Sequence, residues 1–180
     1  TQPGQAQAGT GKEIRIALLL PLTHSDGNIR KTAKSLQDAA QMAVFDSGSQ
    51  NIVLMPRDTG SSPDQAAKAA SSALAEGAEL ILGPLLAADV RTVAPIAAAK
   101  SVPVIAFSND RSVAGNGVFL LSFPPEEEVR RIVLRASQEG RSRFVALVPD
   151  NAYGVRVEAA FQKEVAAAGK ELVAIERYLP

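Results

Sequence analysis

The sequence predicts an α/β protein, with a three-layer α/β/α fold built on a doubly wound parallel sheet. Short apolar segments alternate along the chain with longer, alanine-rich amphipathic segments. Several of the short segments are almost continuous in Val, Ile and Leu, which is typical of strands covered on both faces. Because such strands and helices are joined by right-handed crossovers, we expect the strands to lie parallel.

Seven short apolar runs are predicted as strands. The first of them, IRIALLLPL, contains a single polar residue. A run of this kind does not alternate between polar and apolar side chains, so it indicates a strand that is buried on both faces. In chain order, the predicted strands are 14–22, 51–56, 78–83, 102–108, 118–123, 143–149 and 171–179.

The segments between these strands carry signals for the starts and ends of helices. In the second helix, Ser62 is placed to cap, Pro63 suits the first helical position, Gln65 completes a capping-box pattern and Gly77 follows the last turn. The predicted helices are 29–46, 63–76, 88–100, 125–139 and 155–168.

Two further helices carry similar start and stop signals. Gly140 and Gly169 stand where helices are expected to stop, as residues in the left-handed conformation. The prolines at 124 and 125 open the fourth helix, and the glutamates at 126–128 then lie at its positive end. These glutamates are therefore interpreted as stabilising a helix start and not as acid/base catalysts.

The order of the elements predicts two lobes. Residues 1–13 are rich in Gln, Gly and Ala and are expected to form a flexible tether. Residues 14–123 are predicted to form a first α/β lobe, and 124–180 a crossover helix with part of a second lobe. A single strand–helix–strand unit cannot cover both faces of its strands. We therefore expect the chain to be part of a larger protein. The exposed sheet edge of the second lobe is expected either to pair with another chain or to be covered by a neighbouring molecule in a crystal.

Composition excludes several classes of function. The 19 basic and 19 acidic residues balance, and no Lys/Arg cluster occurs, which argues against nucleic-acid binding. There is no cysteine, so disulfides and thiolate chemistry are excluded, and a single histidine makes a zinc site improbable. The longest apolar run, 16–22, is far shorter than the roughly 20 residues that span a bilayer.

No catalytic constellation is predicted. His24, Ser25 and Asp26 are adjacent in sequence, whereas the members of a triad are brought together by the fold, so we interpret this stretch as a solvated turn. The GTGK at 9–12 lacks the leading glycine and the following Ser or Thr of a phosphate loop. We expect no enzyme activity, no cofactor and no metal.

The candidate site follows from the fold. In open α/β sheets, ligands bind beyond the carboxyl ends of the strands. Polar residues follow the first and fourth strands, and an apolar turn follows the third; for these loop residues, ordinary loop capping is the alternative. A tyrosine of the second lobe could contribute from an opposite wall, and its alternative is a turn residue that packs locally. The candidate ligand- or partner-binding residues are Thr23, Leu86, Ala87, Ala88, Ser108, Asn109, Asp110 and Tyr153.

The order of motifs resembles a known family. IALLLPLT, PRDTGSSPDQAAKAA, ELILGPLLAADV, VPVIAFSND and PDNAYGVRVEAAFQKEV are similar to type I periplasmic binding proteins of the branched-chain amino-acid receptor kind. LLSFPPEEEVRRI and the segment from VALVPDNAYG to IERYLP resemble the C-terminal domain of the lipoprotein activators of penicillin-binding proteins. The resemblance implies two α/β lobes hinged around a cleft.

The resemblance also implies a function. Receptors of this family hold the ligand carboxylate with hydroxyl residues after the Gly-Pro turn, where this chain has Ala87 and Ala88, and Asp110 would repel a carboxylate. The implied protein is a non-catalytic periplasmic regulator, tethered to the outer membrane by an N-terminal lipid, that docks on a peptidoglycan synthase. The alternative is the solute-binding protein of an ABC importer for amino acids or another small ligand.

Overall fold

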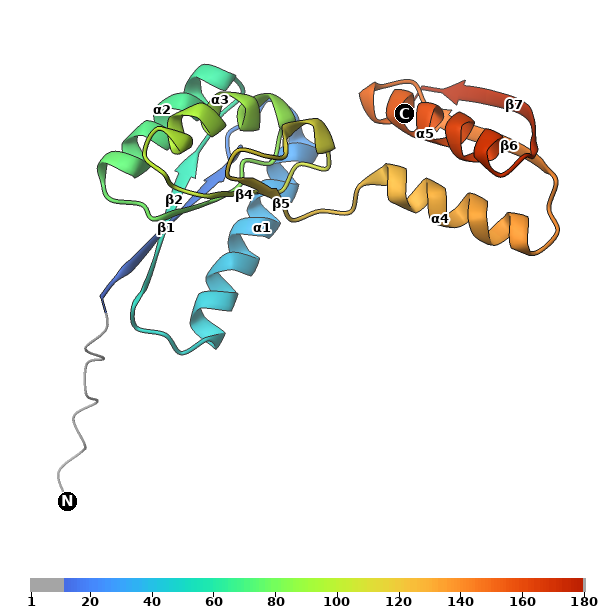
Figure 1. Cartoon of the computed structure of the whole chain (residues 1–180). Coiled ribbons are helices and arrows are strands. Elements are labelled where there is room, and N and C mark those ends of the chain that lie inside the picture. The colour runs from blue at the N-terminus through green and yellow to red at the C-terminus, as the bar shows by residue number, and fades with distance from the viewer. Residues whose placement is uncertain (1–11, 180) are drawn as a thin grey trace. The chain divides into compact units, whose positions relative to one another are not determined.

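The computed structural model describes residues 12–179, and the chain divides into two compact units, Thr1–Ser122 and Phe123–Pro180 (Figure 1). We call them unit 1 and unit 2 and describe each by itself. The predicted tether lies almost wholly outside the described residues, and residues 12 and 13 precede the first strand without regular structure. No helix in residues 12–179 is long and apolar enough to cross a membrane.

Unit 1 is built on a five-stranded parallel sheet in the order β2-β1-β3-β4-β5. The chain moves from β1 to β2 on one side and then returns to β3 on the other, so the switch point of the sheet lies between β1 and β3. The elements of unit 1 are β1 (Ile14–Leu20), α1 (Gly27–Asp46), β2 (Ile52–Asp58), α2 (Pro63–Ala75), β3 (Leu80–Leu82), α3 (Ala87–Ala98), β4 (Val104–Ala106), the 3₁₀ helix η1 (Arg111–Val113) and β5 (Val118–Leu120).

Helices cover both faces of this sheet, as the sequence predicts. Figure 1 shows α2 and α3 on one face and α1 on the other. Successive side chains of a strand point to opposite faces, so Ala17 and Leu19 pack beneath α2 and α3, while Leu18 and Leu20 pack on the side of α1. All four are buried. This explains the unbroken apolar run of the first strand and confirms the three-layer fold class.

The later strands of unit 1 are shorter than predicted. β3, β4 and β5 each have three residues in the ladder, although their apolar runs are longer. At the start of the β3 run, the N–H of Ala78 bonds to the carbonyl of Ala73 and closes α2. At the end of the β4 run, the N–H of Phe107 turns to the carbonyl of Pro84. The apolar runs in the sequence are thus longer than the segments whose backbones pair in the sheet.

The helix signals are confirmed with small shifts. Ser62 caps α2 by accepting from the N–H of Gln65 at 3.4 Å, but the side chain of Gln65 accepts from the N–H of Ser61 at 2.9 Å, one residue before the position of a standard capping box. Gly77 has φ +87°. α1 begins two residues earlier than predicted because Asp26 caps it, accepting from the N–H groups of Asn28 and Ile29.

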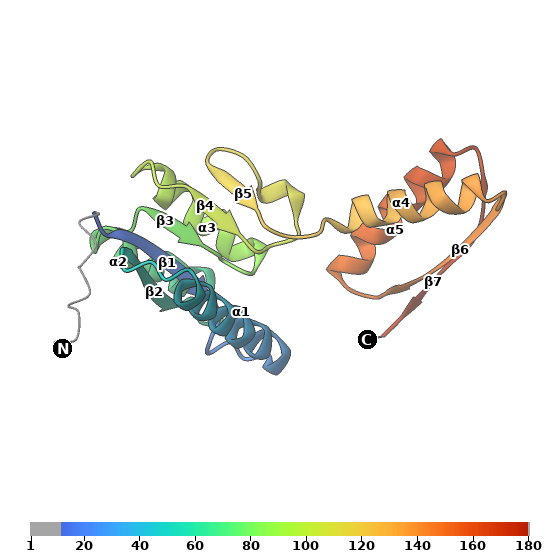
Figure 2. The same cartoon turned by 90° about the horizontal axis from the view of Figure 1, so that it is seen from below.

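Unit 2 is a smaller layered unit. Its elements are α4 (Pro125–Gln138), β6 (Arg143–Pro149), α5 (Ala152–Ala167) and β7 (Glu171–Tyr178), and the two strands pair in parallel. Both helices lie on one side of the strand pair (Figure 2). Val133, Phe144 and Val165 form the core, with Phe161 edge-on to Phe144 at 6.2 Å between ring centroids.

The opposite face of the β6–β7 pair is apolar and uncovered. Val145 and Leu147 alternate with the buried Phe144 and Val148, and their exposed fractions are 63% and 70%. The two helices of unit 2 therefore cover a single face of its strands. The expected pairing or covering of the sheet edge of this unit stays a prediction.

Candidate functional site

The carboxyl ends of β1, β2, β3 and β4 bring four loops of unit 1 to one edge of the sheet, because the strands are parallel. All the predicted site residues of unit 1 lie in these loops or, for Ala87 and Ala88, in the first turn of α3. Tyr153 belongs to unit 2, as the second residue of α5, with 44% of its surface exposed. Its expected role in the same site stays a prediction.

Thr23 is held by Asp58, which ends β2. The hydroxyl of Thr23 donates to the Asp58 carboxylate, and the N–H of Thr23 donates at 3.2 Å. The N–H of Gly60 donates to the same carboxylate at 2.9 Å. Burial alone would raise the pKa of Asp58, but these hydrogen bonds together favour the ionised form and hold its pKa below the usual value. Thr23 is therefore a structural partner of Asp58.

The rest of the first loop is also closed by internal bonds. The N–H of Ser25 donates to the hydroxyl of Ser61 at 2.9 Å, and His24 Nδ1 accepts from the N–H of Asp26 at 3.0 Å. Arg30 donates to the carbonyls of His24 and Ser25. His24, Ser25 and Asp26 thus use their polar groups to shape the start of α1, and their geometry is unlike that of a triad.

The turn before α3 leads into a helix without a side-chain cap in residues 12–179. Gly83 has φ +92° and a cis peptide bond to Pro84. Leu86 is the N-cap of α3, and no side chain caps this helix in the described part of the chain. Because the first N–H groups of a helix have no partner within it, those of Ala87 and Ala88 remain available at this edge.

The last loop forms a bonded cluster around Asp110. The buried hydroxyl of Ser108 accepts from the N–H of Asp110 at 3.2 Å, and Asp110 caps η1 by accepting from the N–H of Ser112 at 2.9 Å. Arg91 of α3 donates to the Asp110 carboxylate at 2.8 Å. Arg91 compensates the charge of Asp110, which weakens the repulsion expected towards a carboxylate. Asn109 lies exposed beside this cluster.

The structure adds one acidic residue that sequence reasoning missed. Asp89, in the first turn of α3, is only 3% exposed, and Thr59, directly after β2, is fully buried. Burial raises the pKa of Asp89, whereas the Thr59 hydroxyl beside it and the charge of His24 lower it by less. Asp89 shares an i, i+4, i+8 stripe with the buried Val93 and Ala97, and this spacing is the signal in the sequence that could have found it.

The raised pKa of Asp89 has a consequence for stability. The folded protein binds a proton at this carboxyl more readily than the unfolded chain does. Protonated Asp89 therefore contributes to the free energy of unfolding below 3.8, the pKa in the unfolded chain, and this contribution is lost as pH rises through the pKa in the folded protein. Asp89→Asn should therefore gain stability relative to the unchanged protein between pH 4 and pH 7, by about 1.4 kcal/mol for every tenfold difference in proton affinity between the two states. Urea unfolding across this range measures it, with the exposed Asp64→Asn as control. Parallel profiles for Asp89→Asn and the unchanged protein would contradict the assignment.

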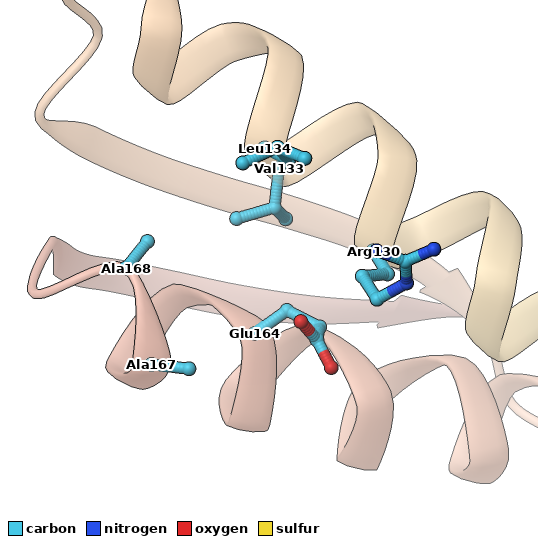
Figure 3. Close-up of a pocket in the computed structure, with 6 residues that line it drawn as sticks. All are labelled: Arg130, Val133, Leu134, Glu164, Ala167 and Ala168. Carbon is cyan, nitrogen blue, oxygen red and sulfur yellow. The ribbon is translucent and has the colours of Figure 1, made fainter.

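Three grooves of the structure lie away from this edge. Figure 3 shows one between α4 and α5 of unit 2, with Arg130, Val133 and Leu134 on one wall and Glu164 and Ala167 among the residues opposite. Its volume of about 180 Å³ is below the range of about 300–1,000 Å³ that small-molecule sites occupy. A larger groove lies at the C-terminal ends of α2 and α3, away from the carboxyl edge of the strands.

No group of three or more His, Asp or Glu side chains in residues 12–179 is arranged to hold a metal ion. What the carboxyl edge of unit 1 offers is backbone N–H groups, internally bonded hydroxyls and one buried acid. In an open parallel α/β lobe, this edge is the place where ligands are usually bound.

The chain belongs to the periplasmic binding protein family, whose sequence model matches residues 13–180. It is similar to penicillin-binding protein activator LpoA of Pantoea ananatis, with 30% identity over 140 residues, 77% of this chain and 18% of that protein. LpoA of Vibrio cholerae is 26% identical over 172 residues, 93% of this chain and 28% of that protein. The chain thus spans less than a third of these relatives, and both confirm the predicted resemblance.

Solved structures confirm the type I fold. An ABC transporter substrate-binding protein from Sphaerobacter thermophilus has a TM-score of 0.80 at 23% identity, covering 93% of this chain and 48% of that one. A solute-binding protein from Rhodopseudomonas palustris, solved with 3,4-dihydroxybenzoic acid, has a TM-score of 0.76 at 20% identity, covering 93% and 47%. These relatives are named as activators or binding proteins and not as enzymes.

Proposed function

We propose that this chain is a non-catalytic periplasmic regulator of peptidoglycan synthesis, which activates a penicillin-binding protein by direct contact. The observation that carries the proposal is the Gly-Pro turn before α3, which gives the helix no side-chain cap and continues with only leucine and alanine at residues 85–88. The similarity to the activator LpoA, which extends over 93% of this chain in the Vibrio cholerae protein, supports the same conclusion.

The turn before α3 lacks the hydroxyl side chains with which a receptor would hold a carboxylate ligand. A receptor that holds a carboxylate gains most from charge-assisted hydrogen bonds given by hydroxyl or basic groups. At the matching edge, Ala87 and Ala88 offer methyl groups, and Thr23 is already bonded to Asp58. A lobe whose polar side chains bond to one another suits a scaffold that presents its surface to another protein.

The proposed location follows from the same relatives. Membership of the periplasmic binding protein family favours the periplasm. Attachment to the outer membrane through a lipid at the N-terminus is what the resemblance of the sequence to lipoprotein activators implies. The Gln-rich residues 1–13 would then act as the spacer between the anchor and the first lobe.

The alternative function is that of a solute-binding protein for an ABC importer. The specific observation in its favour is that the N–H groups at the start of α3 have no side-chain cap, and such groups can bind an anion. Similar structures include a leucine-binding protein from Thermotoga maritima, with a TM-score of 0.69 at 22% identity. At this identity the comparison supports the alternative only as far as the fold.

Two measurements on the purified chain separate these functions. Immobilised bifunctional penicillin-binding protein should retain the chain, whereas a solute-binding protein of the same fold, used as control, should pass through. A thermal-shift screen with the twenty amino acids should leave the melting temperature unchanged, since a ligand that binds the folded state raises it. A saturable increase with one amino acid, without retention on the synthase, would favour the importer.

A further inference from the structure

A groove lies between α4 and α5 on the surface of unit 2. It contains two hollows, of about 180 and about 290 Å³, and Glu164 of α5 lines both of them. Figure 3 shows the two walls of the first hollow, with Leu134 of α4 on one side. Leu134 is 48% exposed, which leaves a large apolar side chain open to a partner. The apolar lining of the two hollows is Val133, Leu134, Ala159, Ala160, Ala167 and Ala168.

Glu164 is the unexplained charged group of this groove. It is half-buried, and it makes no hydrogen bond or ion pair with residues 12–179. Arg130 lies on the opposite wall (Figure 3), but its Nε donates to Glu127 at 3.0 Å. In the second hollow, Glu126 accepts from Nε and Nη2 of Arg156 at 2.9 and 2.6 Å. The carboxylate common to both hollows is thus the one that has no bonded partner among these lining residues.

The size and the lining of the groove indicate what it can hold. Each hollow is smaller than the range of about 300–1,000 Å³ that small-molecule sites occupy. Two hollows along one pair of helices instead fit successive anchor side chains of a docked helix, which recur at i, i+3 or i+4 and i+7. The apolar lining suits the apolar face of such a helix. Glu164 requires a basic residue on it, and Lys163, at the exposed rim, suits an acidic one.

We propose that the groove between α4 and α5 is the docking surface for an amphipathic helix of the penicillin-binding protein. Apolar side chains of this helix fill the two hollows, and one Lys or Arg pairs with Glu164. Because a charge-assisted hydrogen bond is directional, this pair fixes the register of the helix as well as adding affinity. The inference rests on the proposed function, and it names the face of the chain that makes the contact.

Binding of the chain to an immobilised, purified bifunctional penicillin-binding protein, followed by biolayer interferometry, tests the proposal. Glu164→Lys should weaken binding by about tenfold or more, because it sets a like charge against the basic residue of the helix. Glu164→Gln should weaken binding less and make the affinity less sensitive to salt. The matched control is Glu176→Lys, an equal charge reversal at an exposed position that pairs with Leu147 on the uncovered face of the β6–β7 pair. It should bind as the unchanged chain does.

Cysteine labelling locates the contact, because the chain has no cysteine of its own. Ala167→Cys places a thiol in the groove, whereas Ala166→Cys places one at the neighbouring exposed position, which lines neither hollow. The penicillin-binding protein should slow maleimide labelling of the first variant several-fold and leave the second unchanged, since a covered thiol is less accessible to the reagent. Mass spectrometry of the chain measures both rates.

The outcomes separate this inference from the function on which it rests. Circular dichroism shows whether each variant is folded. If the unchanged chain does not bind the penicillin-binding protein, the proposed function fails and the docking surface fails with it. If the unchanged chain binds but folded Glu164→Lys binds equally well, if Glu176→Lys is the variant that loses binding, or if Ala167→Cys is not protected, the function stands and the groove is not the docking surface.

Discussion

Gly83→Ala is expected to destabilise the protein by about 3 kcal/mol or more. Gly83 has φ +92°, a conformation that residues with a side chain rarely adopt, and a Cβ added here would lie 2.1 Å from the backbone oxygen of Leu19. That oxygen belongs to the interior strand β1, which pairs with β2 on one side and β3 on the other, so it cannot move away without disturbing the sheet. The close approach of the two backbones therefore requires glycine.

The matched control for this variant is Gly48→Ala. Gly48 also has a positive φ, +62°, but an added Cβ would meet nothing within 4 Å. Gly48→Ala should therefore lower the free energy of unfolding only through backbone strain, by about 1–2 kcal/mol. Urea unfolding followed by circular dichroism measures both. If the two variants are equally stable, the contact between Gly83 and Leu19 is not a constraint on the fold.

Gly154→Ala is expected to destabilise unit 2 by about 3 kcal/mol, although alanine is the better helix former. Gly154 lies in the first turn of α5, where its N–H donates to the cap Asn151 at 3.0 Å. An added Cβ would lie 1.7 Å from the carbonyl oxygen of Pro149, at the end of β6. The clash of this Cβ with the Pro149 carbonyl opposes the intrinsic helix propensity, which by itself would favour alanine over glycine by about 1 kcal/mol.

Tyrosine fluorescence makes this prediction specific. Both tyrosines of the chain, Tyr153 and Tyr178, lie in unit 2, and there is no tryptophan. Their signal should report an earlier urea transition in Gly154→Ala. The reverse exchange at an exposed helical position, Ala166→Gly, should cost only about 1 kcal/mol. A variant Gly154→Ala that is more stable than the unchanged protein would show that propensity, and not packing, decides at this position.

The sequence predicts the layers of the fold better than the details of the edge. The unbroken apolar run of β1 and the capping residues around α2 act locally, so they can be recognised without knowing the tertiary structure. The pairing of Arg91 with Asp110 joins residues 19 positions apart, and the burial of Asp89 depends on Thr59 and on the loop after β1. Such contacts arise from the tertiary arrangement, and no local pattern of residue types specifies them.

The candidate site, too, could be predicted from local sequence signals only in part. The turn before α3 can be recognised because a Gly-Pro pair between a strand and a helix is a local signal, and its apolar character is visible in the sequence. The hydroxyl groups of the loops can be named from the sequence, but their partners cannot. The hydroxyl of Thr23 bonds to Asp58 and that of Ser108 to the N–H of Asp110, and both partners are set by the folded loops.

The rate of glycan-chain polymerisation by a purified bifunctional penicillin-binding protein tests the central proposal most directly. The measurement compares the synthase alone, the synthase with this chain, and the synthase with a leucine-binding protein of the same fold at equal concentration. We expect this chain to raise the rate several-fold in a saturable manner, and the leucine-binding protein to have no effect. An unchanged rate at saturating concentrations of the folded chain would contradict its assignment as an activator.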